Sequence, residues 1–482
     1  MKVERNVDFS PKTGAYPHQM EATEFIRGEK THEVALFDEQ GLGKTKIVID
    51  SVAADIRDKI IDAALVVCKK SLIGMWTSEV EKHSHLVALA IYGTLRERGL
   101  SATTDADFYI TSYETLTPEL PRIKQLLETG RMAVILDESH RIKDPESVAA
   151  CSAFEISPLA AKRIIITGTP VANSPQDLWS QFYFLDKGKT LGSDFLEFKN
   201  DYCPAAPRKG LSPEDMNKIE LLREKIRPMS IRRLKQDVLE LPDKRYENVF
   251  IELPEEQRRI YDRACQELMV EIEAVDGTIV NKEIENILEK MLRLVQISSN
   301  PILVNPEYSG RSGKLDVLEA LVDKAFDRGE KVIVWTSFVD NIPQVKKMFA
   351  ESSPLVIYGE TPIEQRNRNV KRFQNEDRYR LLIANPSAAR EGLTLTAANN
   401  AIYYDRTFNL VDYVQSQDRI HRISQTRPCN IIKVIAHDTI DEYIDEILNR
   451  KAAIASYVQG DIDKGDVIEA FSKEDILRYL GK

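Results

Sequence analysis

The feature that most constrains the fold is a glycine-rich turn near the start of the chain. Residues 33–37 have the apolar character of a buried strand, and residues 47–49 indicate a helix soon afterwards. Between them, Gly41 and Gly43 let the backbone turn sharply and point its N–H groups at an anion. The positive end of the following helix points at the same place. The sequence therefore predicts a phosphate-binding loop between a strand and a helix.

Each part of this loop has a predicted task. Lys44 supplies a point charge for the outer phosphates, and Thr45 offers a hydroxyl to Mg²⁺. The predicted nucleotide contacts form one unbroken run of Gln40, Gly41, Leu42, Gly43, Lys44 and Thr45. The strict pattern has a glycine where Asp38 stands, so the loop by itself leaves open an ordinary strand-to-helix turn. Upstream, Gln19 is either an adenine-reading amide or a surface residue.

A second motif supports nucleotide hydrolysis. The apolar run 132–136 ends in Asp137-Glu138-Ser139-His140, as a Walker B strand does. In that interpretation Asp137 holds Mg²⁺, directly or through water, and Glu138 orients or deprotonates the attacking water. Taken alone, this is also compatible with an ordinary strand end carrying solvated acids. The two motifs in this order predict an enzyme that hydrolyses a nucleotide with Mg²⁺.

Composition sets outer limits on the protein class. The 482 residues are enough for two or three domains, and an apolar share of 43% is ordinary for a globular protein. The net charge of −10 argues against a generally basic surface but allows a local basic groove. Scattered cysteines, the absence of a long apolar run and a polar N-terminus predict a cytoplasmic protein without a signal peptide or membrane span.

Apolar strands alternate with helical segments in the first part of the chain, which predicts a parallel sheet covered by helices. In such sheets the working residues lie beyond the carboxyl ends of the strands. Polar residues follow the predicted strands 65–68 and 108–110 there. Singly, each is compatible with a cap or a turn. Together they suit a phosphodiester backbone, and the predicted DNA contacts among them are Lys69, Ser71, Thr111 and Tyr113.

The rhythm of strands predicts three regions. Residues 1–186 form a nucleotide-binding lobe, residues 187–310 form helical insertions and a linker, and residues 311–482 form a second lobe without its own phosphate loop. In the second lobe, Arg419 and Arg422 are three apart and would share a face of a helix. They are predicted arginine fingers toward the nucleotide, with a pair of surface arginines as the alternative.

The order of these motifs resembles the SNF2 family of superfamily 2 helicase-like ATPases. The resemblance runs from about Tyr16 to Ile447 and includes the family forms of motifs I, II, III and VI at Asp38–Thr45, Asp137–His140, Thr167–Pro170 and Gln415–Gln425. The pair Arg232-Arg233 with Lys235 resembles an SNF2-specific stretch. The chain departs from the family pattern at Arg390-Glu391, Ser299-Asn300-Pro301 and Trp335-Thr336-Ser337.

The resemblance implies two RecA-like α/β lobes with SNF2-type helical insertions, ATP and Mg²⁺ as cofactors, and double-stranded DNA as partner. It adds Thr336 and Thr394 to the predicted DNA contacts. The implied activity is translocation along duplex DNA without strand separation. The alternatives are a strand-separating helicase or branched-DNA remodeller, a binding module that uses ATP as a switch, and an RNA-dependent motor. A short motor without chromatin modules suggests a bacterial, archaeal or viral host, and a protein partner is left open.

Overall fold

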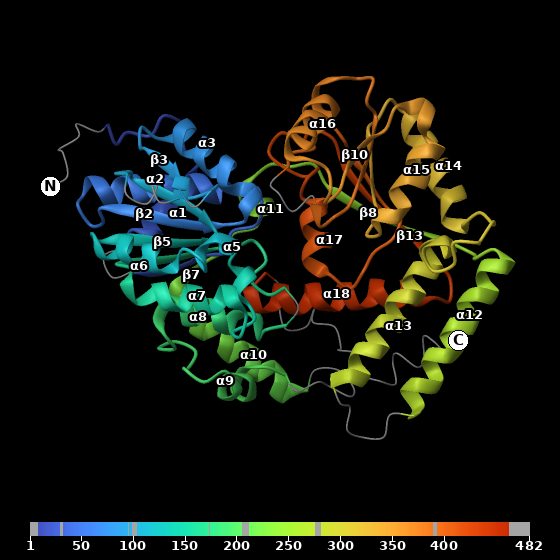
Figure 1. Ribbon diagram of the computed structural model, residues 1–482, viewed down its shortest axis with the longest axis horizontal. Coiled ribbons are helices and arrows are strands. Elements are labelled where there is room, and N and C mark those ends of the chain that lie inside the picture. Colours follow the sequence, from blue (N-terminus) through green and yellow to red (C-terminus); the bar gives the residue numbers. More distant parts are fainter. Residues whose placement is uncertain are drawn as a thin grey trace. The chain divides into compact units, whose positions relative to one another are not determined.

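A computed structural model describes residues 8–28, 32–94, 96–98, 104–172, 174–204, 212–274, 281–388 and 393–461. They form two compact units (Figure 1). The described part of the first unit comprises the residues up to 204, residues 212–239 and residues 453–461, and the second comprises residues 240–452 apart from the gaps. Among the described residues, no helix is both long enough and apolar enough to cross a membrane.

The first unit is built on a seven-stranded parallel sheet with the order β3-β4-β2-β5-β6-β1-β7. Its strands are β1 Glu33–Leu36, β2 Ala63–Cys68, β3 Ala88–Ala90, β4 Phe108–Ser112, β5 Met132–Asp137, β6 Lys162–Ile166 and β7 Ser230–Ile231. The central strands are buried on both faces, which is why they read in the sequence as unbroken apolar runs.

Alternate residues of each strand enter two hydrophobic clusters, one on each face of this sheet. Val34 packs with one helical layer and Ala35 with the other. The first layer contains α1 Pro17–Ile26, α2 Lys44–Arg57 and α3 Ile73–His83. The second contains α5 Tyr113–Leu116, α6 Leu120–Glu128, α7 Val148–Ile156, α8 Asp177–Asp186, α9 Phe195–Tyr202 and α10 Pro213–Ile226.

The second unit has a six-stranded parallel sheet with the order β10-β11-β9-β12-β13-β8. Its strands are β8 Lys244–Ile251, β9 Val332–Trp335, β10 Leu355–Ile357, β11 Leu381–Ala384, β12 Asn400–Tyr403 and β13 Cys429–Ala436. Its helices are α12 Glu255–Ala274, α13 Asn281–Ser299, α14 Gly313–Asp327, α15 Ile342–Met348, α16 Ile363–Asn375, α17 Leu410–Gln417 and α18 Ile440–Gln459, whose last turns are grouped with the first unit. Two parallel-sheet lobes with surrounding helices confirm the predicted fold class.

Residues 187–310 differ from the expected purely helical stretch. Long helices α12 and α13 are present, but β7 joins the first sheet beside β1, and all eight residues of β8 pair with β13. The strand β8 lies at the edge of its sheet, and most of its residues are exposed. Its charged side chains therefore hide the apolar pattern by which the buried strands are recognised.

Candidate active site

The glycine-rich loop follows β1 and leads directly into α2. Gly41 and Gly43 have φ values of 93° and 81°, in the left-handed region that glycine tolerates best. A Cβ atom on Gly43 would also collide with the amide nitrogen of Gln19. Because α2 begins at Lys44, its N-terminus faces the loop, as an anion site requires.

Lys44 lies inside this loop. Its Nζ donates to the carbonyl oxygens of Asp38 and Glu39 at 2.8 and 3.2 Å. Burial lowers the pKa of Lys44 against the opposing pull of the carboxylates of Glu138, Asp38 and Asp137. The ammonium group thus lies close to three acidic residues, and its two hydrogen bonds go to carbonyl oxygens of its own loop. These bonds can be exchanged for bonds to phosphate oxygens when a nucleotide binds.

Gln19 secures the loop from α1. Its Oε1 accepts from the backbone N–H of Tyr16, and its Nε2 donates to the carbonyl of Leu42, both at 3.1 Å. Both ends of the amide that was expected to read an adenine are therefore bonded within the protein. The adenine contact stays a prediction, while the contact of Gln19 with Leu42 ties α1 to the loop.

The Walker B carboxylates follow at the end of β5. Glu138 takes a left-handed conformation, with φ 51° and ψ 52°, at a cost of roughly 1–2 kcal/mol for a residue with a side chain. Its carboxylate accepts from Gln40 Nε2 at 3.2 Å and from Thr167 Oγ1 at 3.4 Å, and it lies 3.3 Å from His140 Nδ1. Residues of three separate motifs therefore meet at Glu138.

Electrostatics favour a cation at this point. Burial and the neighbouring Glu138 carboxylate raise the pKa of Asp137. Two adjacent carboxylates in a buried place repel each other, and a divalent cation relieves that repulsion. Gly168 approaches from the neighbouring strand end so closely that an added Cβ would lie 3.4 Å from Lys44 Nζ. The loop, the carboxylates and the segment after β6 therefore lie around the same site, next to Lys44.

The structure explains why Asp38 stands at a glycine position. Asp38 is fully buried, and its carboxylate accepts two hydrogen bonds from the Arg233 guanidinium. Nε donates to Oδ1 at 3.1 Å, and Nη2 donates to Oδ2. Arg232 beside it donates to the carbonyl of Phe37 at 2.6 Å and forms a bidentate pair with Asp461. Lys235 pairs with Glu39 at 3.4 Å.

These three cations show what the sequence analysis missed. A run of charges usually forms a solvated face, but the side chains of Arg232, Arg233 and Lys235 are largely buried against the loop. One signal was available: an acid at a glycine position of a phosphate loop needs a counter-charge. The cation that supplies this counter-charge is Arg233, which lies 195 residues away in the chain.

The predicted DNA contacts divide into two groups. Thr111 and Thr336 are fully buried, and their hydroxyls donate to the carbonyl of Ile91 and to Asp405 Oδ2. Tyr113 is also buried, and its hydroxyl donates to the carbonyl of Asp137 at 2.9 Å. These side chains point inward, so direct contact with a phosphate is not available to them in this structure. The three that remain partly exposed are Lys69, Ser71 and Thr394.

Arg419 and Arg422 do not share a helical face, so that expectation was wrong. The helix α17 ends at Gln417, and both arginines lie in the turns that follow it. Beyond the end of the helix, the carbonyl of Arg419 accepts from the backbone N–H of Leu395, at 2.9 Å. The guanidinium of Arg422 donates to Thr394 Oγ1 and to the carbonyl of Asp418.

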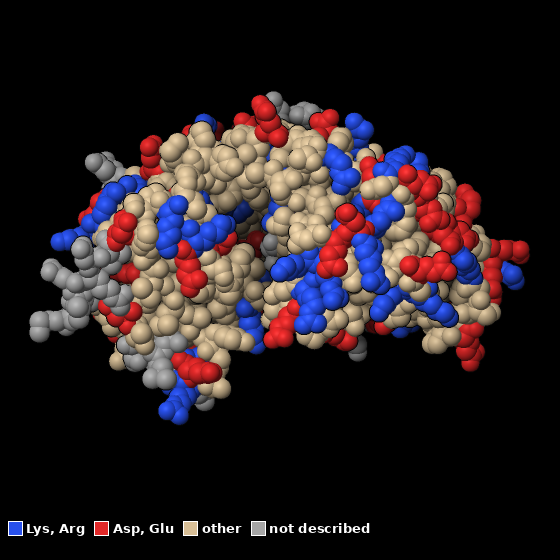
Figure 2. Space-filling view, turned by 90° about the horizontal axis from the view of Figure 1, so that it is seen from above, with Lys and Arg blue, Asp and Glu red and all other residues tan. Residues whose placement is uncertain are grey.

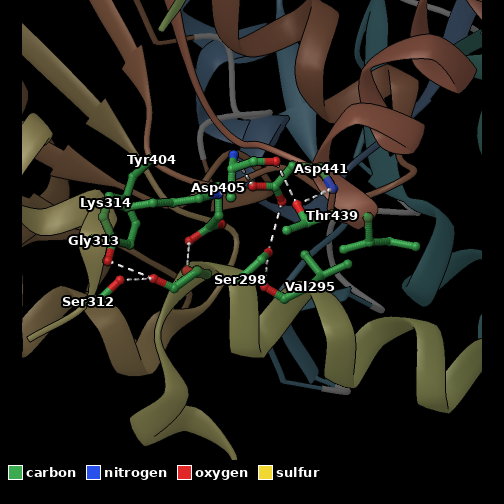
Figure 3. A network of polar contacts seen from close by, with 12 residues as sticks. Val295, Ser298, Ser312, Gly313, Lys314, Tyr404, Asp405, Thr439 and Asp441 are labelled. Atoms are coloured by element: carbon green, nitrogen blue, oxygen red, sulfur yellow. Dashed lines mark hydrogen bonds and ion pairs between the residues drawn. The ribbon is translucent and has the colours of Figure 1, made fainter. Parts of the chain in front are cut away.

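A buried polar network lies at the carboxyl ends of the second sheet (Figure 3). Lys314 Nζ lies 2.5 Å from Asp441 Oδ2, and Asp405 accepts from the hydroxyls of Thr336 and Ser299. Burial raises the pKa of Asp405. Lys314 follows the pair Ser312-Gly313, and its ammonium group is held in this network by Asp441.

Comparisons with known proteins match this arrangement. A family model described as SNF2-related domain matches residues 18–303, and one described as helicase conserved C-terminal domain matches residues 313–424. The chain is 28% identical to an ATP-dependent helicase of Mycoplasma genitalium, over 96% of this chain and 44% of that protein. It is 30% identical to an ATP-dependent helicase/translocase, YwqA, of Bacillus subtilis, over 89% and 47%.

The chain therefore spans less than half the length of these curated relatives. A solved structure, the SWI2/SNF2 ATPase core of Sulfolobus solfataricus in complex with dsDNA, is 27% identical and covers 97% of this chain and 100% of its own. The TM-score of that comparison is 0.45.

Proposed function

The chain belongs to the SNF2 family, and from this premise we propose that it is an ATP-driven motor that moves along double-stranded DNA without separating the strands. The observation that carries the proposal is the meeting of three motifs at Glu138. Gln40 of the loop, His140 beside the carboxylate and Thr167 after β6 all contact this side chain. Such an arrangement serves hydrolysis, because each contact orients the group that receives the proton of the attacking water.

The residues present fit ATP and Mg²⁺. The loop from Gly41 to Thr45 and the N-terminus of α2 suit the phosphates, with Lys44 as the charge among them. Thr45 and Asp137 offer oxygen ligands of the kind that Mg²⁺ prefers. When bound, the ion neutralises charge on the phosphates. Arg419 and Arg422 are proposed as arginine fingers from the second unit.

The proposed division of the chain follows the motifs. Residues 1–186 bind the nucleotide, residues 187–310 supply the insertions and linker, and residues 311–482 form the helicase-type lobe. DNA contacts are proposed for the partly exposed residues Lys69, Ser71 and Thr394. Hydroxyls, amines and backbone N–H groups at strand ends favour the phosphodiester backbone over the base edges.

A group of exposed cations on the second unit supports a DNA-binding role. In the view from above, Figure 2 shows Lys and Arg side chains over this unit, interspersed with Asp and Glu. The helix α16 contributes exposed Arg368, Lys371 and Arg372. We expect DNA affinity to fall linearly on a log–log plot as salt rises, and to vary little with sequence at fixed salt, because phosphate contacts release counterions and read no bases. Fluorescence anisotropy with several duplexes of different sequence measures both; a strong preference for one duplex would contradict the prediction.

Movement without strand separation is the most specific part of the proposal. Opening a duplex costs about 1.4 kcal/mol per base-pair step, and enzymes that do so need a wedge. The strands described within residues 335–388 and 393–422 are β10, β11 and β12, and each pairs in parallel, so none forms a hairpin wedge.

The test compares two DNA substrates with ATP. One is a duplex that carries a third strand in its major groove, which a passing motor displaces. The other is a forked duplex, which only a helicase opens. We expect release of the third strand while the fork stays paired. Efficient opening of a long fork would replace the proposal with the strand-separating alternative, and Glu138→Gln should be inactive on both substrates.

A further inference from the structure

Trp76 makes a contact that the mechanism above does not use. It lies on the first turns of α3, its side chain is fully buried, and its Nε1–H donates to Asp137 Oδ2 at 2.8 Å. The other carboxylate oxygen of Asp137 accepts from the backbone N–H of Glu138 at 3.0 Å. An indole is only a donor, so it needs an acceptor when it is buried, and here that acceptor is the proposed magnesium ligand.

Tyr113 reaches the same residue from another strand end. Its hydroxyl donates to the carbonyl oxygen of Asp137 at 2.9 Å. In the sheet β2 lies between β4 and β5, and the segments after β2 and β4 both reach the end of β5 through the hydrogen bonds of Trp76 and Tyr113 with Asp137. The side chain and the main chain of Asp137 are thus held from two neighbouring segments.

The segment after β2 also carries residues with a proposed role in DNA binding. Lys69 and Ser71 lie in and beside the short turn η1, Lys70–Leu72, and α3 follows it without a break at Ile73. Trp76 is therefore four residues from the end of that turn. A shift of η1 that accompanies contact with a phosphodiester backbone moves the start of α3, and the indole of Trp76 moves with it.

We propose that Trp76 is a positioning residue that holds the Asp137 carboxylate in the orientation that takes Mg²⁺, and that it carries DNA occupancy at η1 to the magnesium site. Tyr113 supports the same carboxylate through its backbone. The inference rests on the proposed function and adds the physical link by which DNA stimulates hydrolysis. A purely space-filling role for Trp76 is the competing explanation, and it requires no indole N–H.

The test removes the N–H and keeps the aromatic ring. Trp76→Phe is compared with Trp179→Phe, a matched control in the same unit, because the Trp179 indole also donates a hydrogen bond, to the carbonyl of Gly192 at 3.2 Å. The first readout is the affinity for a fluorescent methylanthraniloyl-ADP with Mg²⁺ and with EDTA. We expect the factor by which Mg²⁺ increases the affinity for this nucleotide to fall by roughly tenfold in Trp76→Phe, as for loss of a hydrogen bond to a charged group. The affinity for the nucleotide in EDTA should be unchanged.

The second readout is the ATPase rate as a function of Mg²⁺ and of linear duplex DNA. In Trp76→Phe we expect a higher half-saturating Mg²⁺ concentration and a smaller stimulation by DNA, with DNA affinity preserved. If Trp76→Phe matches Trp179→Phe in both readouts, the inference is overturned. If the wild-type protein itself shows no DNA-stimulated hydrolysis, the proposed function fails first.

Folding is checked by thermal unfolding of each variant. If Trp76→Phe does not fold, Tyr113→Phe replaces it, because that variant loses only one hydroxyl. Tyr113→Phe should also reduce the factor by which Mg²⁺ increases the affinity for the nucleotide. An unchanged Mg²⁺ response in a folded Tyr113→Phe protein would then overturn the link to Asp137.

Discussion

Glu138→Gln is expected to reduce ATP turnover by roughly 10²–10⁴-fold, the usual contribution of a positioned general base, while nucleotide binding persists. The amide has the shape of the carboxylate, so the contacts with Gln40 and Thr167 can be kept. It cannot accept the proton of water at pH 7. The measurement is steady-state ATPase rate with duplex DNA, beside the affinity for methylanthraniloyl-ADP.

Two further variants are compared with Glu138→Gln. Lys44→Ala should lose nucleotide binding itself, since it removes the charge within the loop. Glu155→Gln makes the same chemical change on an exposed residue whose recorded partner is Lys124, and its turnover should equal that of the wild type. A Glu138→Gln protein with full turnover would remove Glu138 from the proposed chemistry.

Arg422→Ala should lower turnover by about 10³-fold or more, the lower bound for loss of an arginine finger, with little change in DNA affinity. Arg422→Lys should restore little of this, because lysine keeps the charge but not the planar fork. ATPase rate and anisotropy with a labelled duplex separate the two effects.

Arg427→Ala is the matched control. Arg427 lies five residues after Arg422 in the chain, and its guanidinium also donates to a carbonyl oxygen, that of Ala397. Its turnover should stay near the wild-type rate. Loss of DNA binding in Arg422→Ala, with the ATPase rate retained, would instead place Arg422 in the DNA groove. Unfolding curves must accompany both variants because Arg422 is partly buried and bonded to Thr394 and Asp418, and desolvation lowers the pKa of its guanidinium.

The buried strands and the phosphate loop were the most predictable parts of this protein. A parallel strand is covered on both faces, so β2 and β5 appear as continuous apolar runs whose ends carry the chemistry. The edge strand β8 was not recognised because it lacks that cover. The end of α17 at Gln417 was also missed, because no local pattern in the sequence marks it.

Side-chain direction set the other limit. Spacing places Thr111 and Lys69 near the ends of neighbouring strands, and this much was correct. Whether a hydroxyl then points to solvent or to a carbonyl depends on the packing of the next strand, as for Thr111 and Ile91. The pairing of Asp38 with Arg233 was beyond sequence reasoning for a similar reason: the charge requirement is local, but the partner is not.

The pairing of Asp38 with Arg233 also affects the order in which contacts can form during synthesis of the chain. A nascent chain that has emerged only as far as residue 204 lacks β7, so β1 would be an open edge strand. Asp38 would be without Arg233, and an unpaired buried charge costs about 3–5 kcal/mol. Arg232 in turn waits for Asp461. The phosphate loop, which is synthesised before both arginines and Asp461, therefore reaches its final set of contacts only after they have emerged.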